Sequence, residues 1–156
     1  MLVVALACEL DSPYLDPDGP RYAGDYSQPD AMLASPLRVV SYNLEFGREV
    51  DTAIAALQTS ELGNADIVLM QEMDADATER IAEALSLAYV YYPASVKNGS
   101  DFGNAVLARV PITSDAKLLL PHADPYTASR RIATSATVES PEGTIRIYST
   151  HTATVS

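Results

Sequence analysis

Three polar residues that could do chemistry stand at the ends of apolar runs in this sequence. Asn43, Glu72 and His151 follow runs at residues 37–42, 66–70 and 144–150 respectively. Such runs are typical of buried strands, and a carboxylate placed just after one requires water, a partner or a metal ion. An imidazole changes its charge close to neutral pH, so His151 is suited to proton transfer. We therefore expect an amide, a carboxylate and an imidazole to share one edge of a sheet, where active sites of α/β proteins tend to lie.

The elements that must position these residues change character along the chain. In the first half, strands alternate with two helices, one from residue 50 to about 62 and one opened by a capping box at 76–79. Strands are predicted at residues 88–92, 104–108, 116–120, 132–138 and 144–150. Alternation followed by mostly strands favours an α/β fold built as a two-sheet sandwich over a doubly wound sheet.

Four segments form an ordered set of motifs: Ser41 to Asn43, Asp66 to Glu72, Asp101 to Ile112 and Tyr148 to His151. This set resembles the motifs of the endonuclease/exonuclease/phosphatase superfamily. These metal-dependent phosphoesterases include pancreatic-type deoxyribonucleases, inositol-polyphosphate phosphatases and sphingomyelinases. Each motif is short, but their order and spacing across residues 37–151 make the resemblance specific. It implies a DNase-like four-layer αββα fold, in which two facing sheets are flanked by helices.

The resemblance also implies a reaction, the hydrolysis of phosphomono- or phosphodiesters with Mg²⁺, or Mn²⁺, as cofactor. Glu72 would hold the ion, and Asn43 would orient the phosphate or a metal-bound water. His151 would donate to a phosphate oxygen or protonate the leaving group. Arg131 and Asn104 are the candidates for contacting the substrate. Mg²⁺ suits this set because one or two carboxylates, completed by waters and substrate oxygens, are enough to bind it.

Each candidate also has a plain structural interpretation, and the sequence leaves both open. Glu72 could be a solvated acid at a strand end, Asn43 a turn residue that closes its strand, and His151 a surface residue. Arg131 could balance nearby acids, and Asn104 could shape a tight turn into its strand.

Two further motifs of the family, a Gly-Asp-x-Asn segment and a Ser-Asp-His segment, do not occur before Ser156, where this sequence stops. We therefore expect an N-terminal part of the domain, incomplete at its C-terminus and inactive alone. A truncated or degenerate family member that acts as a non-catalytic binding module is the alternative.

Charge disfavours a general nuclease. The formal net charge is −11, whereas non-specific binding of nucleic acid depends on Lys and Arg side chains that neutralise phosphates. Acidity does not exclude a phosphate-ester substrate, because a bound divalent cation can reverse the local field. Hydrophobic residues make up 47% of the chain and charged residues 20%, which is typical of a globular domain rather than a disordered one.

Residues 1–36 differ in composition from the rest. They contain six acids, one Arg and five of the ten prolines, so we expect a leader and an acidic, Pro-rich linker ahead of a domain at 37–156. The run before Cys8 is similar to the end of a bacterial lipoprotein signal, in which the cysteine is lipidated. This predicts a cell-envelope or secreted protein with a lipid anchor at Cys8. The alternative is a hydrophobic stub on a cytoplasmic protein, and the run is too short to span a bilayer.

Overall fold

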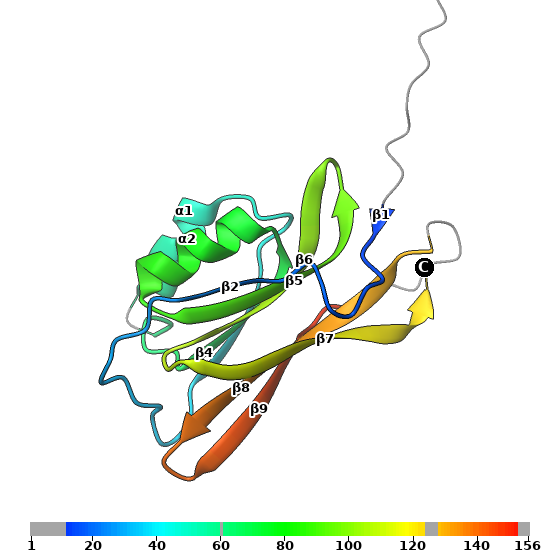
Figure 1. The fold of residues 1–156 in the computed structure, drawn as a ribbon. Helices are drawn as coiled ribbons and strands as arrows, with labels where there is room; N and C mark the ends of the chain where they lie inside the picture. Colours follow the sequence, from blue (N-terminus) through cyan, green and yellow to red (C-terminus); the bar gives the residue numbers. More distant parts are fainter. Residues whose placement is uncertain (1–11, 60, 124–127, 153–156) are drawn as a thin grey trace, which may run out of the picture.

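The computed structural model describes residues 12–59, 61–123 and 128–152, which form two sheets and two helices (Figure 1). The larger, six-stranded sheet contains β1 (Ser12–Pro13), β2 (Tyr22–Asp25), β3 (Val39–Asn43), β4 (Ile67–Met73), β5 (Ala88–Lys97) and β6 (Ser100–Ala108). The smaller sheet contains β7 (Ile112–Ala123), β8 (Arg130–Ser140) and β9 (Gly143–Thr150). The helices are α1 (Val50–Leu57) and α2 (Ala75–Leu85).

One parallel pair determines which strand ends meet in the larger sheet. β3 and β4 run parallel with α1 between them in the chain, and Asn43 lies opposite Gln71. The other neighbours pair antiparallel, in the order β1-β5-β6-β4-β3, and β2 pairs with β5 beside this path. Because parallel strands end at the same edge of a sheet, the residues that follow β3 and β4 lie side by side.

Apolar side chains cover both faces of the larger sheet. One core lies under the helices and includes Leu57, Ile81 and Met70. The other lies between the sheets and includes Val106 and Ile132. Figure 1 shows the helices on one side of the larger sheet and β7–β9 on the other. This arrangement confirms the predicted two-sheet α/β sandwich. Within the described residues no helix covers the outer face of β7–β9.

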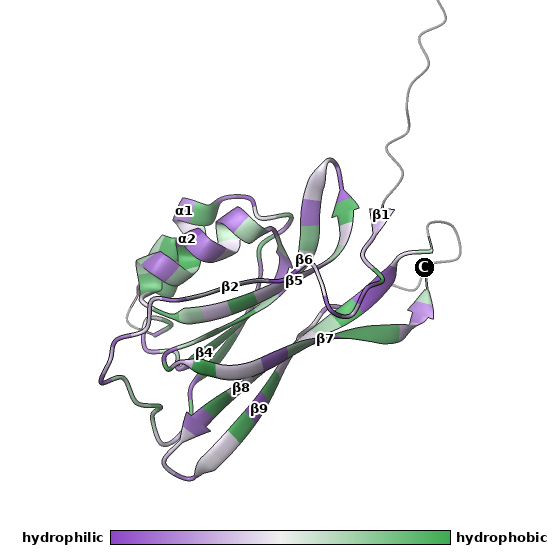
Figure 2. Cartoon of the chain, in the orientation of Figure 1, coloured by the Kyte–Doolittle hydropathy of each residue, from purple (hydrophilic) through white to green (hydrophobic). Residues whose placement is uncertain are grey.

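The smaller sheet follows the period of two expected of a sheet with one buried face. On β9, Ile147 and Ser149 are buried while Arg146 and Tyr148 are exposed, and Figure 2 shows polar and hydrophobic residues alternating along this strand. β8 is the middle strand and is buried over most of its length. His151, an expected site residue, comes two residues after the buried Ser149 and so continues the inward-facing positions of β9.

The helices differ from the sequence expectation at their ends. The capping box expected at Asp76 is wrong by two residues, because α2 begins after Asp74, whose side chain accepts a 2.7 Å hydrogen bond from the backbone of Ala77. α1 ends at Leu57 rather than near residue 62, and the described residues at 58–59 and 61–64 form bends and turns. Both differences are shifts of helix ends. The helices bury Val50, Ala53 and Leu57 on α1 and Ala77, Thr78, Ile81 and Ala82 on α2.

Residues 12–36, expected to form a linker, instead contribute to the sandwich. β1 and β2 pair antiparallel with β5, and Leu33 is buried in the core between the sheets. The described structure therefore begins before the expected domain start at Leu37. The reason is physical: a segment that pairs through its backbone with an edge strand needs no apolar pattern of its own.

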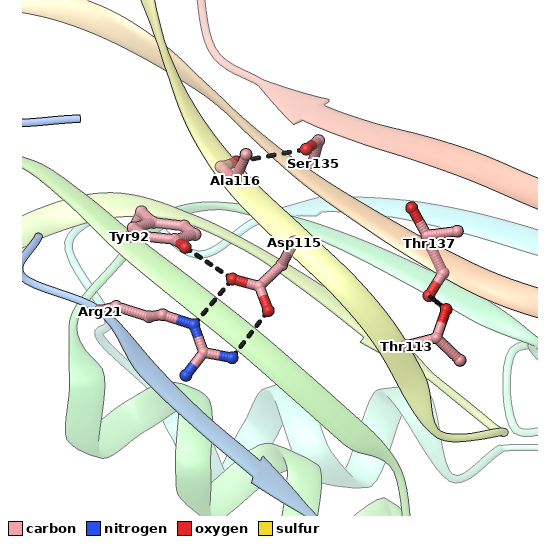
Figure 3. Close-up of polar contacts among 7 residues, drawn as sticks. All are labelled: Arg21, Tyr92, Thr113, Asp115, Ala116, Ser135 and Thr137. Atoms are coloured by element: carbon pink, nitrogen blue, oxygen red, sulfur yellow. Dashed lines mark hydrogen bonds and ion pairs between the residues drawn. The ribbon is translucent and has the colours of Figure 1, made fainter. Parts of the chain in front are cut away.

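A carboxylate on β7 joins this N-terminal segment to both sheets (Figure 3). Arg21 donates two hydrogen bonds of 2.7 Å to Asp115, and the hydroxyl of Tyr92 on β5 donates a third of 2.6 Å. The Arg21 guanidinium lowers the pKa of Asp115 below its usual value, although burial acts in the opposite direction. Asp115 thus holds three elements together in its ionised form.

A buried lysine on the same strand makes a second connection. Lys117 is 3% exposed, and its ammonium donates to the backbone oxygens of Tyr14 and Gly19. Burial lowers the pKa of Lys117, and Asp16 opposes this shift.

Within the described residues no helix is long and apolar enough to cross a membrane. Cys8 and the apolar run before it lie outside those residues, so the lipid anchor stays a prediction.

Candidate functional site

A bulge at the end of β4 turns Glu72 toward the smaller sheet. Along β4, Met70 packs beneath the helices and Leu69 packs toward the smaller sheet. Strict alternation would place residue 72 on the helix side with Met70. Instead the pairing with β6 shifts between Gln71 and Met73, Glu72 has a φ of 58°, and Met73 takes the helix-facing position. A left-handed backbone is costly for a glutamate, and such strain tends to occur at functional sites.

Glu72 and His151 meet at this bulge. Glu72 Oε1 lies 3.6 Å from His151 Nδ1, and the two side chains are 16% and 25% exposed. Nη1 of Arg131 lies 3.2 Å from the same nitrogen. Since a guanidinium can only donate, Nδ1 is the acceptor, and this assigns the ring proton to Nε2. The geometry therefore brings together three of the five residues singled out in the sequence.

The surroundings favour a neutral His151. Burial lowers the pKa of the ring, and the positive charge of Arg131 lowers it further. Glu72 acts in the opposite direction and Lys97 adds to the lowering. A neutral ring with its proton on Nε2 can donate a hydrogen bond to an anion, and it is less often charged at pH 7 than an exposed histidine.

Asn43 lies at the same edge, with its side chain engaged in a turn. It closes β3 opposite Gln71, one residue before Glu72, and its Oδ1 accepts a 2.9 Å hydrogen bond from the backbone of Glu45. This is the turn-closing bond that Asn often makes. The side chain is exposed, so an amide oxygen near Glu72 still has a second lone pair available.

The structure gives Asn104 a different environment. Its side chain is buried and donates a 3.0 Å hydrogen bond to the backbone oxygen of Ile132 on β8. Its backbone oxygen accepts from the hydroxyl of Thr134. These bonds join β6 to β8 across the sandwich. No contact with Glu72 or His151 accompanies them among the described interactions, and substrate contact by Asn104 stays a prediction.

Sequence reasoning missed the polar pair behind the site. Gln71 Nε2 donates a 3.2 Å hydrogen bond to Ser149 Oγ, which in turn donates to the backbone oxygen of Met70. Both side chains are buried between the sheets, and each lies one or two residues from a candidate. A polar residue at an inward position of an otherwise apolar strand is the signal that could have found them. Their bonds hold the end of β4 against β9 beside Glu72 and His151.

The donor set fits a magnesium ion better than a closed metal cage. Within residues 12–59, 61–123 and 128–152, no group of three or more His, Cys, Asp or Glu side chains is placed to hold a metal. Mg²⁺ keeps several waters and accepts one or two carboxylates, so the Glu72 carboxylate with the Asn43 amide suits it. Structural zinc needs four protein ligands and does not match.

Comparisons with known proteins agree with this architecture. The model of the Endonuclease/Exonuclease/phosphatase family matches residues 40–150. Among solved structures, the chain is similar to an endonuclease/exonuclease/phosphatase family protein from Leptotrichia buccalis C-1013-b, with 17% identity and a TM-score of 0.60. The match covers 74% of this chain and 53% of that one, so this chain spans about half the length of its structural relative, and the likeness shows the fold. The comparison with curated proteins found no match. Because the family model matches most of its residues, the chain belongs to the endonuclease/exonuclease/phosphatase family.

Proposed function

We propose that this chain carries part of the active site of a Mg²⁺-dependent phosphoesterase, which hydrolyses phosphomono- or phosphodiesters. The observation that carries the proposal is the 3.6 Å separation of Glu72 Oε1 from His151 Nδ1, which the bulge in β4 produces. Membership of a family that is generally hydrolytic supports the same reaction type. The strained backbone of Glu72 supports a functional origin for the bulge.

Each of the candidate residues would have a role that fits the chemistry of its side chain. Glu72 and Asn43 would hold Mg²⁺, which when bound neutralises charge on the phosphoryl oxygens and makes a bound water more acidic. His151 would donate a hydrogen bond from Nε2 to a phosphate oxygen. Its lowered pKa favours this role over protonation of the leaving group, because little imidazolium is present at pH 7. Arg131 orients the ring of His151 through Nδ1 and would face the same phosphate.

Manganese binding followed by NMR tests the metal site. The ring signal of His151 reports on this site, because its Nδ1 lies 3.6 Å from Glu72 Oε1. Paramagnetic Mn²⁺ held by Glu72 should broaden that signal. Glu72→Gln should weaken this effect about tenfold or more, since even the loss of a residue that only supports a metal ligand costs about 10- to 100-fold in affinity.

Glu142→Gln is the matched control, because Glu142 lies in the turn between β8 and β9 and its loss removes the same charge. It should leave the broadening of His151 unchanged. Equal Mn²⁺ effects in wild type and Glu72→Gln would exclude the ligand role. Turnover of bis(p-nitrophenyl) phosphate by this chain would show that the incomplete site suffices for catalysis and would exclude a non-catalytic binding module, whereas ion binding without turnover agrees with the expectation that the chain is inactive alone.

A further inference from the structure

An exposed aromatic ring stands beside the candidate site. Phe46, in the loop between β3 and α1, is 40% exposed. Its ring centre lies 5.2 Å from that of Phe102, a buried residue of β6. The ring of Phe102 lies in turn 6.5 Å from that of His151. The cations of Lys97 and Arg131 also lie over Phe102. Phe46 is therefore separated from the candidate histidine by a single ring.

The backbone of this loop is strained where it presents the ring. Phe46 has a φ of 65°, and three neighbours are left-handed as well: Glu45, Gly47 and Glu49. A left-handed backbone is an outlier for a bulky side chain, and strain of this kind tends to occur at functional sites. The loop thus pays a conformational cost to place a large apolar ring in water.

Contacts on both sides of Phe46 fix the loop. Leu44 is 5% exposed, and its backbone donates a 3.1 Å hydrogen bond to the backbone oxygen of Gln71. On the other side, a Cβ added at Gly47 would lie 2.9 Å from Oδ2 of Asp74, the residue that caps α2. The exposed ring therefore has a defined position relative to the end of β4 and the start of α2.

One cation covers the exposed ring, and its cover is loose. Arg48 Cζ lies 5.7 Å from the centre of the Phe46 ring. The side chain of Arg48 is 66% exposed, and its ion pair with Glu45 is 4.0 Å long. Exposed ion pairs contribute little, so the guanidinium is free to move aside or to stack on an incoming ring itself.

Building on the function proposed above, we propose that Phe46 is a specificity-determining residue that stacks against a planar ring in the ester group of the substrate. The phosphate of such a substrate lies at His151, and its ring reaches past Phe102 to Phe46. The substrate class is a phosphate ester with an aromatic ring, joined directly to the ester oxygen as in an aryl phosphate or through a sugar as in a nucleotide. Contact with one ring needs no extended basic surface, which agrees with the net charge of −11.

Two monoesters of equal charge and similar size test this role. Phenyl phosphate carries a planar ring and cyclohexyl phosphate a puckered one. In the presence of Mg²⁺, both should shift the ring signal of His151 in NMR titrations. Phenyl phosphate should bind about two- to twelvefold more tightly, the range expected of an aromatic pair beyond the burial of its area. Equal affinities, or no binding of either ester, would overturn the proposal.

Variants separate stacking on the substrate from packing within the protein. Phe46→Leu should remove the preference for phenyl phosphate, and Phe46→Tyr, which keeps the ring, should retain it. Tyr148→Leu is the matched control, because Tyr148 is 47% exposed on the outer face of β9, and this variant should retain the preference. A Phe46 that only covers Phe102 would show a different result: Phe46→Leu would weaken both esters equally and leave their ratio unchanged, which would contradict the proposal.

A second pair of ligands distinguishes the two sources of the ring. Adenosine 5′-monophosphate and ribose 5-phosphate share a sugar and a phosphate, and only the first has a base. A preference for the first of about fivefold or more, lost in Phe46→Leu, would identify a nucleotide. A preference confined to phenyl phosphate would identify an aryl ester. Failure of the phosphoesterase function shows separately, as equal Mn²⁺ broadening of His151 in wild type and Glu72→Gln.

Discussion

Replacing Asp115 by alanine removes the carboxylate that connects the N-terminal segment, β5 and β7. Asp115 accepts bonds of 2.7, 2.7 and 2.6 Å, and its side chain is 9% exposed. Without it, the hydroxyl of Tyr92, a buried residue, loses its partner, which costs about 1–3 kcal/mol. Arg21 is 47% exposed and can turn to water, so its ion pair contributes only about 0.5–1 kcal/mol. The sum predicts a loss of about 1.5–4 kcal/mol in the free energy of unfolding.

Urea unfolding followed by circular dichroism measures this loss, provided that the transition is two-state. Arg21→Met should cost only about 1 kcal/mol, because Tyr92 keeps its acceptor. The double variant should show a coupling energy of about 1 kcal/mol between Arg21 and Asp115. In a chain of this size, the loss in Asp115→Ala should lower the thermal midpoint by about 3–16 °C.

Two results would refute this reasoning. Asp115→Ala within about 0.5 kcal/mol of wild type would mean that the three bonds contribute nothing beyond ordinary surface contacts. A cost in Arg21→Met as large as that in Asp115→Ala would mean that the ion pair, and not the buried hydroxyl of Tyr92, carries the energy.

Three further predictions concern the same architecture. The pKa of Asp115 in the folded state is lowered from 3.8, so its contribution to the free energy of unfolding is complete above pH 3.8 and is lost as the pH falls through the lower folded value. The difference in stability between wild type and Asp115→Asn, measured by urea unfolding, should therefore narrow below pH 3.8. A chain that starts at Leu37 should be much less stable in thermal unfolding than one that starts at Ser12, since the first lacks β1, β2 and the buried Leu33; equal midpoints would show that this segment is dispensable. Gly103→Ala should destabilise by about 3 kcal/mol, because its Cβ would lie 2.1 Å from the backbone oxygen of Tyr92, whereas Gly19→Ala, which meets no atom within 4 Å, should stay within about 0.5 kcal/mol of wild type by the same assay.

The sequence predicted the sandwich and the approach of Glu72 to His151 because both depend on strand ends. The apolar runs before Asn43, Glu72 and His151 predict where β3, β4 and β9 end. The parallel pairing of β3 with β4 brings Asn43 and Glu72 to the same edge of the sheet. The contact between Glu72 and His151 follows from facing sheets. The roles of these residues in metal binding and catalysis remain predictions.

The sequence could not predict the bulge or the N-terminal strands. Nothing in Gln71, Glu72 and Met73 marks the middle residue for a left-handed backbone. The bulge lies where β4 pairs with β6, with Gln71 opposite Asn104 and Met73 opposite Gly103. β1 and β2 are short, and their partners lie far along the chain. The cation–π contacts of Phe102 likewise depend on β5 and β8 meeting at one ring, which no local pattern records.

The contacts of Lys117 have a consequence for the order of events during synthesis. Its partner Gly19 precedes it by 98 residues, so at about 5–20 residues per second the ribosome delivers the lysine about 5–20 s after the segment that it binds. Contacts between distant residues also form late, because loop closure must precede them. Until then the edge of β5 that β1 and β2 cover stays open to other chains. The segment that contains Tyr14 and Gly19 is therefore made well before the lysine that holds it against β7.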